Sequence, residues 1–342
     1  MDSFTQAVLG AAIGEAALGR HAGRKAALWG AVCGTLPDLD SFYPFADPVS
    51  AFTYHRGISH SLIVLSALTP VVAWLIARIH RGERPRFGRW LLTVWLCLIT
   101  HPLLDACTTY GTQLLWPFDD TPIAWNNVFI IDPAFTLPLL LAVLAALVLR
   151  PVPPNAERRR ALGAWLNRLA LAWGIAYLVL GAFIKTHVDS HVRASAERQG
   201  IAVQRYIATP ILFNIVLWRA VIMSDDRYYE AFYSLLDDPG EVRFKGFETD
   251  PALLEPLNGN WAVQRLKWFT RGFHSVSRVD DRVVLSDLRM GYEPAYVFRF
   301  VLGKRIGGTT TALPVIKLPQ PSPGIDVLAA GWRRLLGDRE AL

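Results

Sequence analysis

The sequence predicts an α-helical integral membrane bundle of four to six membrane segments, followed by an extramembrane domain of mainly antiparallel β-sheet. Three observations support this fold class. Hydrophobic residues make up 52% of the 342 residues and charged residues only 19%, which is unusual for a soluble protein. Long apolar runs fill the first 185 residues. From residue 186 on, the runs shorten and charged residues lie among them.

Four runs without a charged residue are the clearest membrane segments. They cover residues 61–77, 90–100, 134–149 and 169–184. With its flanks, each run approaches the roughly 20 residues that a helix needs to cross a bilayer. We therefore expect four membrane-spanning helices.

Two earlier segments, 3–19 and 26–37, are rich in glycine and alanine, and the first contains Glu15. Small residues allow helices to pack closely inside a membrane. We interpret both as helices of the bundle, the second stopping short of a full crossing. The alternative is that they are amphipathic or re-entrant pieces lying against the bundle. Because the start MDSFTQ lacks the basic stretch of a secretory signal, we expect the first segment to stay in the mature protein.

The basic residues indicate an orientation. They concentrate in the loops 20–25, 78–89 and 150–160, which the positive-inside rule assigns to the cytoplasm. The stretches 37–60 and 101–132, and everything after about residue 186, then lie on the extracytoplasmic face. The same loops explain the net charge of +6 without nucleic acid as a partner. The three cysteines form no CxxC pair, so neither a disulfide framework nor a zinc ribbon is indicated.

Ionisable residues gather at this outer face. The set comprises Asp2, Asp38, Asp40, His55, His60, His101, Asp105, Asp119, Asp120 and Asp132. Such groups are costly at a membrane unless they are paired, solvated or bound to an ion, so they indicate a functional site. Imidazole together with carboxylate is the ligand set of Zn²⁺ or a related divalent metal.

Three motifs carry most of these residues. PDLD at 37–40 places two carboxylates after a helix-ending proline, and HPLLD at 101–105 places a histidine and an aspartate one helical turn apart. In HRGISH at 55–60, Gly57 permits an unusual turn, and we expect Ser59 to cap the following helix. Each motif also has an ordinary explanation: an acidic loop, a buried His–Asp hydrogen bond and a solvated histidine pair, respectively. Together they predict a metal site.

Other polar residues are weaker candidates. Asp132 precedes Pro133 and is either a further site residue or a helix N-cap. His187 and His191 in HVDSH form either a second ion site, a rim contact or a solvated helix face, and we favour the last. We assign no role to His21, His80 and His274.

The stretches MDSFTQAVLGAAIG, GTLPDLD, HRGISHSL and HPLLDACTTYGTQLLWPF together resemble the bacterial membrane-bound metal-dependent hydrolase family, also described as LexA-binding inner-membrane hydrolases. The resemblance spans roughly residues 1–185. It implies a multi-pass protein of the bacterial inner membrane with a His/Asp metal centre and hydrolytic activity. It assigns a metal-ligand role to Asp38, Asp40, His55, His60, His101 and Asp105.

One position departs from this resemblance. Many relatives have Thr-His near the start, whereas this chain has Thr5 followed by Gln6. A glutamine can coordinate through its carbonyl oxygen or hold a water molecule, but it is a poorer transition-metal ligand than imidazole. If the family site holds more than one ion, we expect this chain to hold fewer.

The sequence after the membrane bundle, from residue 186 on, predicts a β domain. Residues 186–200 continue the last span as a connecting helix, and residues 201–342 form a β-rich domain. Runs rich in β-branched and aromatic residues, including 216–224, 227–236 and 261–279, alternate with turn signals such as DDPG and LNGN. Residues 1–185 then form the membrane domain with the His/Asp site.

The leading functional hypothesis is a metal-dependent hydrolase, with zinc as the expected metal and manganese as the alternative. Asp40 or Asp105 is the expected general base. A site at the membrane face favours a lipid or lipid-linked phosphoester as substrate. The alternative is a membrane sensor or scaffold with a structural metal site and a β domain that binds a protein partner. A transporter is a weaker third option, because its ionisable residues should lie at mid-membrane.

Overall fold

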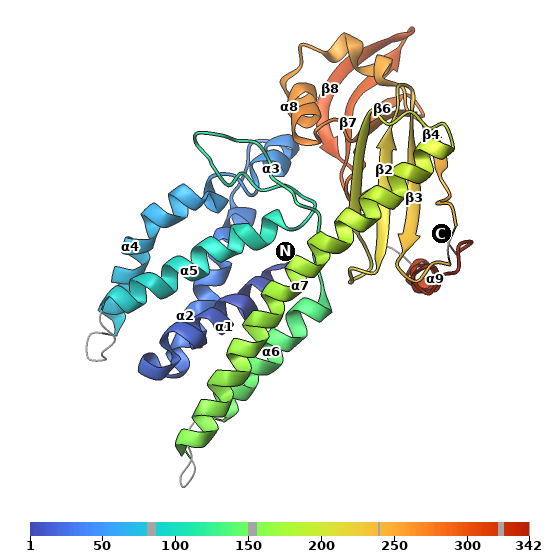
Figure 1. The fold of residues 1–342 in the computed structure, drawn as a ribbon. Coiled ribbons are helices and arrows are strands. Elements are labelled where there is room, and N and C mark those ends of the chain that lie inside the picture. Colours follow the sequence, from blue (N-terminus) through green and yellow to red (C-terminus); the bar gives the residue numbers. More distant parts are fainter. Residues whose placement is uncertain (81–86, 150–155, 239, 321–324, 342) are drawn as a thin grey trace. The chain divides into compact units, whose positions relative to one another are not determined.

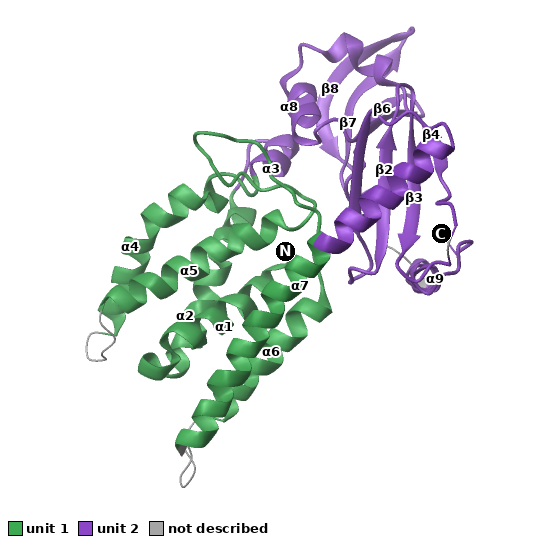
Figure 2. Ribbon diagram, viewed as in Figure 1, with its two compact units in different colours: residues 1–43, 55–182 green, residues 44–54, 183–342 purple. Residues whose placement is uncertain are grey.

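A computed structural model of the chain describes residues 1–80, 87–149, 156–238, 240–320 and 325–341. The chain divides into two compact units, one of residues 1–43 and 55–182, the other of residues 44–54 and 183–342 (Figure 2). The first unit is helical, and the second contains two antiparallel sheets, which confirms the predicted fold class. Parts of the basic loops expected at 78–89 and 150–160 lie outside the described residues.

Helices that lie alongside one another build the described part of the first unit (Figure 1). They are α1 (Ser3–Ala22), α2 (Arg24–Thr35), α4 (Leu62–Ile79), α5 (Phe87–Ala106), α6 (Pro133–Val148) and the first part of α7 (Ala156–Arg198). Among the described helices, α4, α5 and α7 are long and apolar enough to cross a membrane. The fourth predicted span, 134–149, corresponds to α6, which has only 16 residues.

Side-chain caps fix where two of these helices begin. The Ser61 hydroxyl accepts hydrogen bonds from the backbone amides of Ile63 and Val64 at 3.2 and 3.3 Å, so Ser61 is the N-cap of α4. The expectation that Ser59 caps this helix was wrong. Asp132 caps α6 by accepting from the amides of Ala134 and Phe135, as its N-cap interpretation predicted.

Glycines allow α1 and α2 to pack with their backbones in contact. A Cβ atom on Gly10 would lie 2.2 Å from the carbonyl oxygen of Gly30, and one on Gly14 would lie 2.1 Å from that of Ala26. Side chains larger than hydrogen therefore do not fit at these positions. Both glycine-rich segments are helices packed within the bundle, rather than pieces lying against it.

Two four-stranded antiparallel sheets form the second unit. The first contains β1 (Arg205–Pro210), β2 (Leu217–Met223), β3 (Arg227–Ser234) and β4 (Lys245–Glu248), in that order. The second contains β5 (His274–Val279), β6 (Arg282–Asp287), β7 (Arg299–Ile306) and β8 (Thr309–Lys317). The last part of α7 packs on the first sheet, where Val188 and Val192 are buried against Trp218 (Figure 1).

The run 261–279, which the sequence predicted as strand-like, is split between helix and strand. Its first part is α8 (Trp261–Phe269), capped by Asn260, and its second part is β5. The buried residues Ala262, Val263, Leu266 and Phe269 recur at helical spacing, a pattern that its aromatic content obscured. The 3₁₀ helix η3 (Pro251–Leu257) and the C-terminal helix α9 (Ile325–Leu335) also belong to this unit.

A short helix from the middle of the bundle sequence belongs to the second unit. It is α3 (Pro48–Tyr54), between the PDLD and HRGISH motifs. The Phe52 ring lies 4.8, 4.5 and 5.2 Å from the rings of Phe269, Phe298 and Phe300, measured between centroids. Arg265 Nε also donates to the Thr53 hydroxyl at 3.1 Å. The chain between the two motifs is thus anchored in the β-rich unit.

We expect His274 on β5 to make the second unit sensitive to acid. Burial lowers the pKa of His274 to about 4. The nearby positive charges of Lys267, Arg205 and Arg289 also lower this pKa, and the negative charge of Asp287 opposes them. Because the folded unit disfavours the protonated imidazole, its stability should be fully present above pH 6.5 and fall as the pH drops toward 4. The loss attributable to this residue is on the order of 2 kcal/mol.

Thermal unfolding followed by tryptophan fluorescence checks this prediction. Wild type and His274→Gln are compared at pH 7 and pH 4.5, since carboxylates that titrate in the same range contribute equally to both proteins. The variant should lose less stability on acidification than wild type. Equal losses would show that His274 does not contribute.

Candidate metal centre

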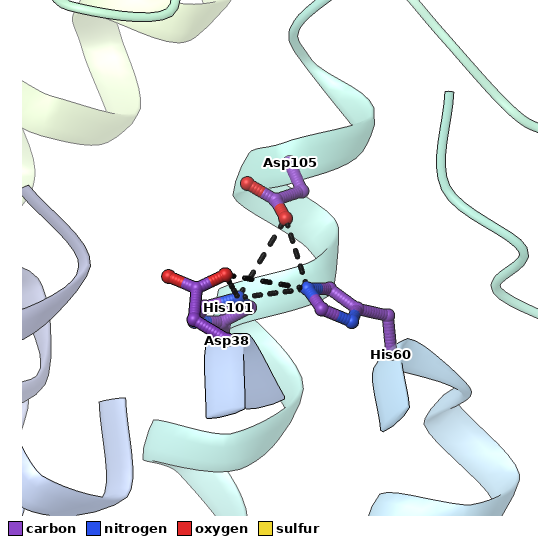
Figure 3. A group of neighbouring side chains, drawn as sticks. All are labelled: Asp38, His60, His101 and Asp105. Carbon is purple, nitrogen blue, oxygen red and sulfur yellow. Dashed lines mark hydrogen bonds and ion pairs between the residues drawn. The ribbon is translucent and has the colours of Figure 1, made fainter. Parts of the chain in front are cut away.

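Four side chains from three separate segments converge in the first unit (Figure 3). Asp38 lies on the 3₁₀ turn η1 (Pro37–Phe42), and His60 ends the turn η2 (Ile58–His60). His101 and Asp105 project from α5, one turn apart, as the HPLLD spacing predicted. One donor atom from each residue lies within 4.8 Å of the other three.

The separations between these donor atoms suit a small four-coordinate ion. Nε2 of His101 lies 3.1 Å from Nε2 of His60 and 3.3 Å from Oδ1 of Asp38. Oδ2 of Asp105 lies 3.3 Å from Nε2 of His60 and 3.6 Å from Nε2 of His101. Ligands arranged tetrahedrally about 2.0–2.2 Å from an ion lie about 3.3–3.6 Å from one another. The donor set therefore fits a tetrahedrally bound divalent metal.

Hydrogen bonds on the far side of each imidazole direct Nε2 toward the centre. Nδ1 of His101 donates to the carbonyl oxygen of Gly34 at 2.6 Å. Nδ1 of His60 lies 2.9 Å from the Ser59 hydroxyl, which itself donates to Oδ2 of Asp40 at 2.6 Å. Since the Ser59 proton goes to Asp40, its oxygen accepts from His60. Both Nε2 lone pairs are then free to bind a metal.

Gln6 holds Asp105 in place from α1. Its amide nitrogen donates to Oδ1 of Asp105 at 3.0 Å and to the carbonyl oxygen of His101 at 3.1 Å. The amino group of Met1 also pairs with Oδ1. Within the described residues no aligned hydrogen bond reaches Oδ2, although Nε of Arg56 lies 3.1 Å away. In the part of the chain that the structure describes, Oδ2 therefore has an ion-pair partner in Arg56 but no hydrogen-bond donor, which leaves a lone pair for a metal ion.

Electrostatics keeps these carboxylates ionised. Burial would raise the pKa of Asp38, but hydrogen bonds from His101 and His60 outweigh it and hold the pKa well below the usual range. Asp40 shows the same balance, with His55 lowering its pKa against burial. Burial likewise opposes a charged His60, yet Asp105 and Asp38 raise its pKa overall. A bound metal would displace the proton from Nε2 of His60 and become the cation beside these carboxylates.

The structure brings together four of the six ligands expected from the sequence. The other two, Asp40 and His55, pair with each other just outside the centre. Nδ1 of His55 lies 2.9 Å from Oδ1 of Asp40, and the imidazole is one-quarter exposed. Asp40 thus stands behind His60, where it orients the imidazole through Ser59.

Residues 1–188, more than half of the chain, match the family described as YdjM inner membrane protein. The chain belongs to the YdjM inner membrane protein family. The matched region contains all four donor residues and ends within α7, before the first strand of the second unit. The YdjM family membership and the apolar helices place the protein in the inner membrane.

Two individual relatives cover shorter segments. YfhP of Bacillus subtilis (strain 168) is 28% identical over 153 residues, which are 42% of this chain and 45% of YfhP. The inner membrane protein YbcI of Escherichia coli (strain K12) is 34% identical over 94 residues, 27% of this chain and 53% of YbcI. The chain thus spans about half the length of these relatives. No solved structure matches the chain.

Arg56 is a site residue that sequence reasoning missed in this YdjM-family chain. It is buried, adopts a left-handed φ of 62°, and stacks over Tyr110 with its guanidinium 5.1 Å from the ring centroid. Its guanidinium also donates to the Thr108 hydroxyl at 3.2 Å. The sequence feature that could have indicated this role is the position of Arg56 inside HRGISH, between two predicted ligands.

The remaining candidates lie elsewhere. Besides capping α6, the buried Asp132 accepts a hydrogen bond from the Tyr177 hydroxyl at 2.9 Å. His187 and His191 pack on Tyr233 of the first sheet, with the His191 ring 4.8 Å from that ring. These contacts favour structural roles for Asp132, His187 and His191.

Removing the Gln6 amide should weaken metal binding. The Gln6→Leu variant keeps a similar volume but leaves Asp105 without one of its fixed hydrogen bonds. Loss of such an outer contact typically lowers metal affinity by about 10–100-fold. Competition with a chelator of known affinity measures the change.

Gln264→Leu, which removes a glutamine on α8 in the other unit, is the control and should bind metal as wild type does. Equal affinity of Gln6→Leu and wild type would show that Gln6 does not support the centre.

Proposed function

We propose that this protein is a metal-dependent hydrolase of the inner membrane, with zinc held by Asp38, His60, His101 and Asp105. The observation that carries the proposal is the set of donor separations, which are 3.1–3.6 Å for the four pairs described above and 3.6 Å between Nε2 of His60 and Oδ1 of Asp38. Two imidazoles and two carboxylates suit zinc better than manganese, which prefers octahedral oxygen ligands. A zinc ion in this site would lower the pKa of a bound water and polarise a phosphoryl oxygen.

The surrounding charge favours an anionic substrate. Asp38 and Asp105 together balance the charge of one divalent ion, and the positive charges of Arg56 and the Met1 amino group outnumber the remaining carboxylate, Asp40. We therefore propose a lipid or lipid-linked phosphoester. In its hydrolysis, the oxygen of water bonds to phosphorus, the phosphorus–oxygen bond to the leaving group breaks, and the leaving oxygen gains a proton.

Asp40 is the carboxylate available for proton transfer. Asp105 belongs to the donor set, whereas Asp40 is paired with the partly exposed His55 through Oδ1. We propose that Asp40 Oδ1 receives the proton of the attacking water, with His55 holding that oxygen in place. The positive-inside rule supports an extracytoplasmic location for this site and for the second unit.

A second candidate function is a sensor or scaffold in which the metal is structural. One feature favours it: four protein donors close the coordination sphere, as in structural zinc sites, whereas catalytic zinc keeps one position for water. Three of the four side chains are fully buried. Asp38, at 14% exposed, is the donor that could give way to water in the enzyme.

The Asp40→Asn variant separates the two candidates. In the hydrolase, the variant should retain stoichiometric metal while hydrolysis of a panel of lipid phosphoesters falls by about 10²–10⁴-fold, the usual contribution of general acid–base catalysis. Asp119→Asn, in an exposed loop, is the matched control. Wild-type protein that holds metal but hydrolyses none of the panel would favour the structural site.

A further inference from the structure

An open apolar groove runs along the first unit between α1, α5, α6 and α7. Its volume is about 660 Å³, within the range of about 300–1,000 Å³ common for ligand sites. Among the described residues that line it, none is charged. The Thr100 hydroxyl in its wall donates to the carbonyl oxygen of Leu96 at 2.7 Å and needs no other partner. The groove is therefore suited to a hydrocarbon.

The length of the groove matches one leaflet of a bilayer. Its lining extends from Leu96 on α5 to Cys107, one residue past the helix end; from Leu96 to Ala106, at about 1.5 Å per residue, is about 15 Å. The hydrocarbon core of a bilayer is about 30 Å thick, so the groove covers about half of it. One end of the groove lies at the same depth along α5 as the metal centre, because Leu104 lines the groove and Asp105 follows it on the next position around the helix.

The groove is continuous with the surface that faces lipid. It lies between α5 and α7, two of the helices that can cross a membrane. At its rim, Ile175 of α7 is 68% exposed. At the end near Cys107, Trp125 is half-exposed, and its backbone amide is bonded to the carbonyl oxygen of Ala106. Tryptophan favours the headgroup level of a membrane, which indicates that this end lies at the interface.

We propose that the groove binds one acyl chain of a bilayer phospholipid, with the headgroup at the end where His101 and Asp105 project from α5. Binding of the lipid does not depend on the proposed function. The further step, that the bound lipid is the substrate and its headgroup phosphoester reaches the metal centre, rests on the proposed function. The chain contributes binding energy by burying its methylenes, while the chemistry stays with the polar residues.

Photocrosslinking tests the proposal on the full-length protein in vesicles. Two phosphatidylglycerol probes are used, one with a diazirine near the ester carbonyl of an acyl chain and one with a diazirine at the chain terminus. The first should label the peptide containing Leu103 and Cys107, and the second the peptides containing Leu96 and Ala17. Labelling spread evenly over exposed helix faces such as Leu141 would overturn the proposal.

A second experiment uses a variant whose added side chain fills the groove. Thr100→Trp should lower labelling by at least about fivefold, equivalent to roughly 1 kcal/mol of lost binding. Leu141→Trp adds the same side chain on the exposed face of α6 and should leave labelling unchanged. Metal content measured on each sample confirms an intact fold. A Thr100→Trp protein that holds metal and labels like wild type contradicts the assignment.

The two proposals fail in distinguishable ways. The His60→Ala/His101→Ala variant should still be labelled in the groove although it lacks the metal ligands. Groove labelling without hydrolysis of any phosphoester leaves the lipid site standing and removes the hydrolase. Metal-dependent hydrolysis of a water-soluble phosphoester without groove labelling removes the lipid site and leaves the hydrolase.

Discussion

Replacing both His60 and His101 with alanine is expected to abolish metal binding and, with it, the proposed hydrolysis. The two imidazoles are half of the donor set, and zinc sites of four ligands supply roughly 10–16 kcal/mol of binding free energy. Without them, Asp38 and Asp105 remain as buried like charges with weakened compensation. Elemental analysis of the purified protein should find about one equivalent of metal in wild type and almost none in the variant.

The matched control is His187→Ala/His191→Ala, which removes two histidines at the same helical spacing as His101 and Asp105 but on the part of α7 that belongs to the second unit. It should bind metal as wild type does. If both double variants keep their metal, the ion is held elsewhere, and the centre described above is not its site.

Substituting leucine for Gly30 is expected to prevent α1 and α2 from packing. A Cβ atom at this position would lie 2.1 Å from the carbonyl oxygen of Gly10, and backbone cannot move aside as a flexible side chain can. Overpacking of this kind costs about 1–3 kcal/mol or more, and four added carbons exceed the usual case. The metal centre should fail as well, because Gln6 and Gly34 on these helices hold Asp105 and His101.

Gly88→Leu is the control for this variant, since a Cβ atom there meets nothing within 4 Å. Size-exclusion profile, thermal midpoint and metal content are measured for both proteins. Gly30→Leu should aggregate or unfold at a much lower temperature, and Gly88→Leu should match wild type. A well-folded Gly30→Leu protein with normal metal content would mean that the two helices do not approach as closely as described.

The sequence predicted those features that follow from composition and regular spacing. Uncharged runs located α4, α5 and α7, and the spacing of HPLLD placed His101 and Asp105 on one face of a helix. The roles of residues in turns were harder to predict from the sequence. Asp38 and Asp40 are two residues apart, and only the 3₁₀ geometry of η1 decides that Asp38 faces the centre while Asp40 meets His55 and Ser59.

Contacts between residues that are far apart in the sequence could not be predicted either. Arg56 lies in a predicted motif, but its contacts with Asp105 and Thr108 come from a helix end about fifty residues away. The helix α8 was mistaken for a strand because its aromatic and β-branched residues favour strands locally, whereas burial at helical spacing decides its conformation.

The position of α3 sets an order of events during biosynthesis. Phe52 packs against Phe269, Phe298 and Phe300, and the last of these is made about 250 residues after it, or about 10–50 s later at typical rates of translation. During that interval the segment between PDLD and HRGISH has no core to join, although all four donor residues have already emerged from the ribosome. The loop that connects two of the three donor segments is therefore among the first parts of the protein to be synthesised and among the last to be fixed.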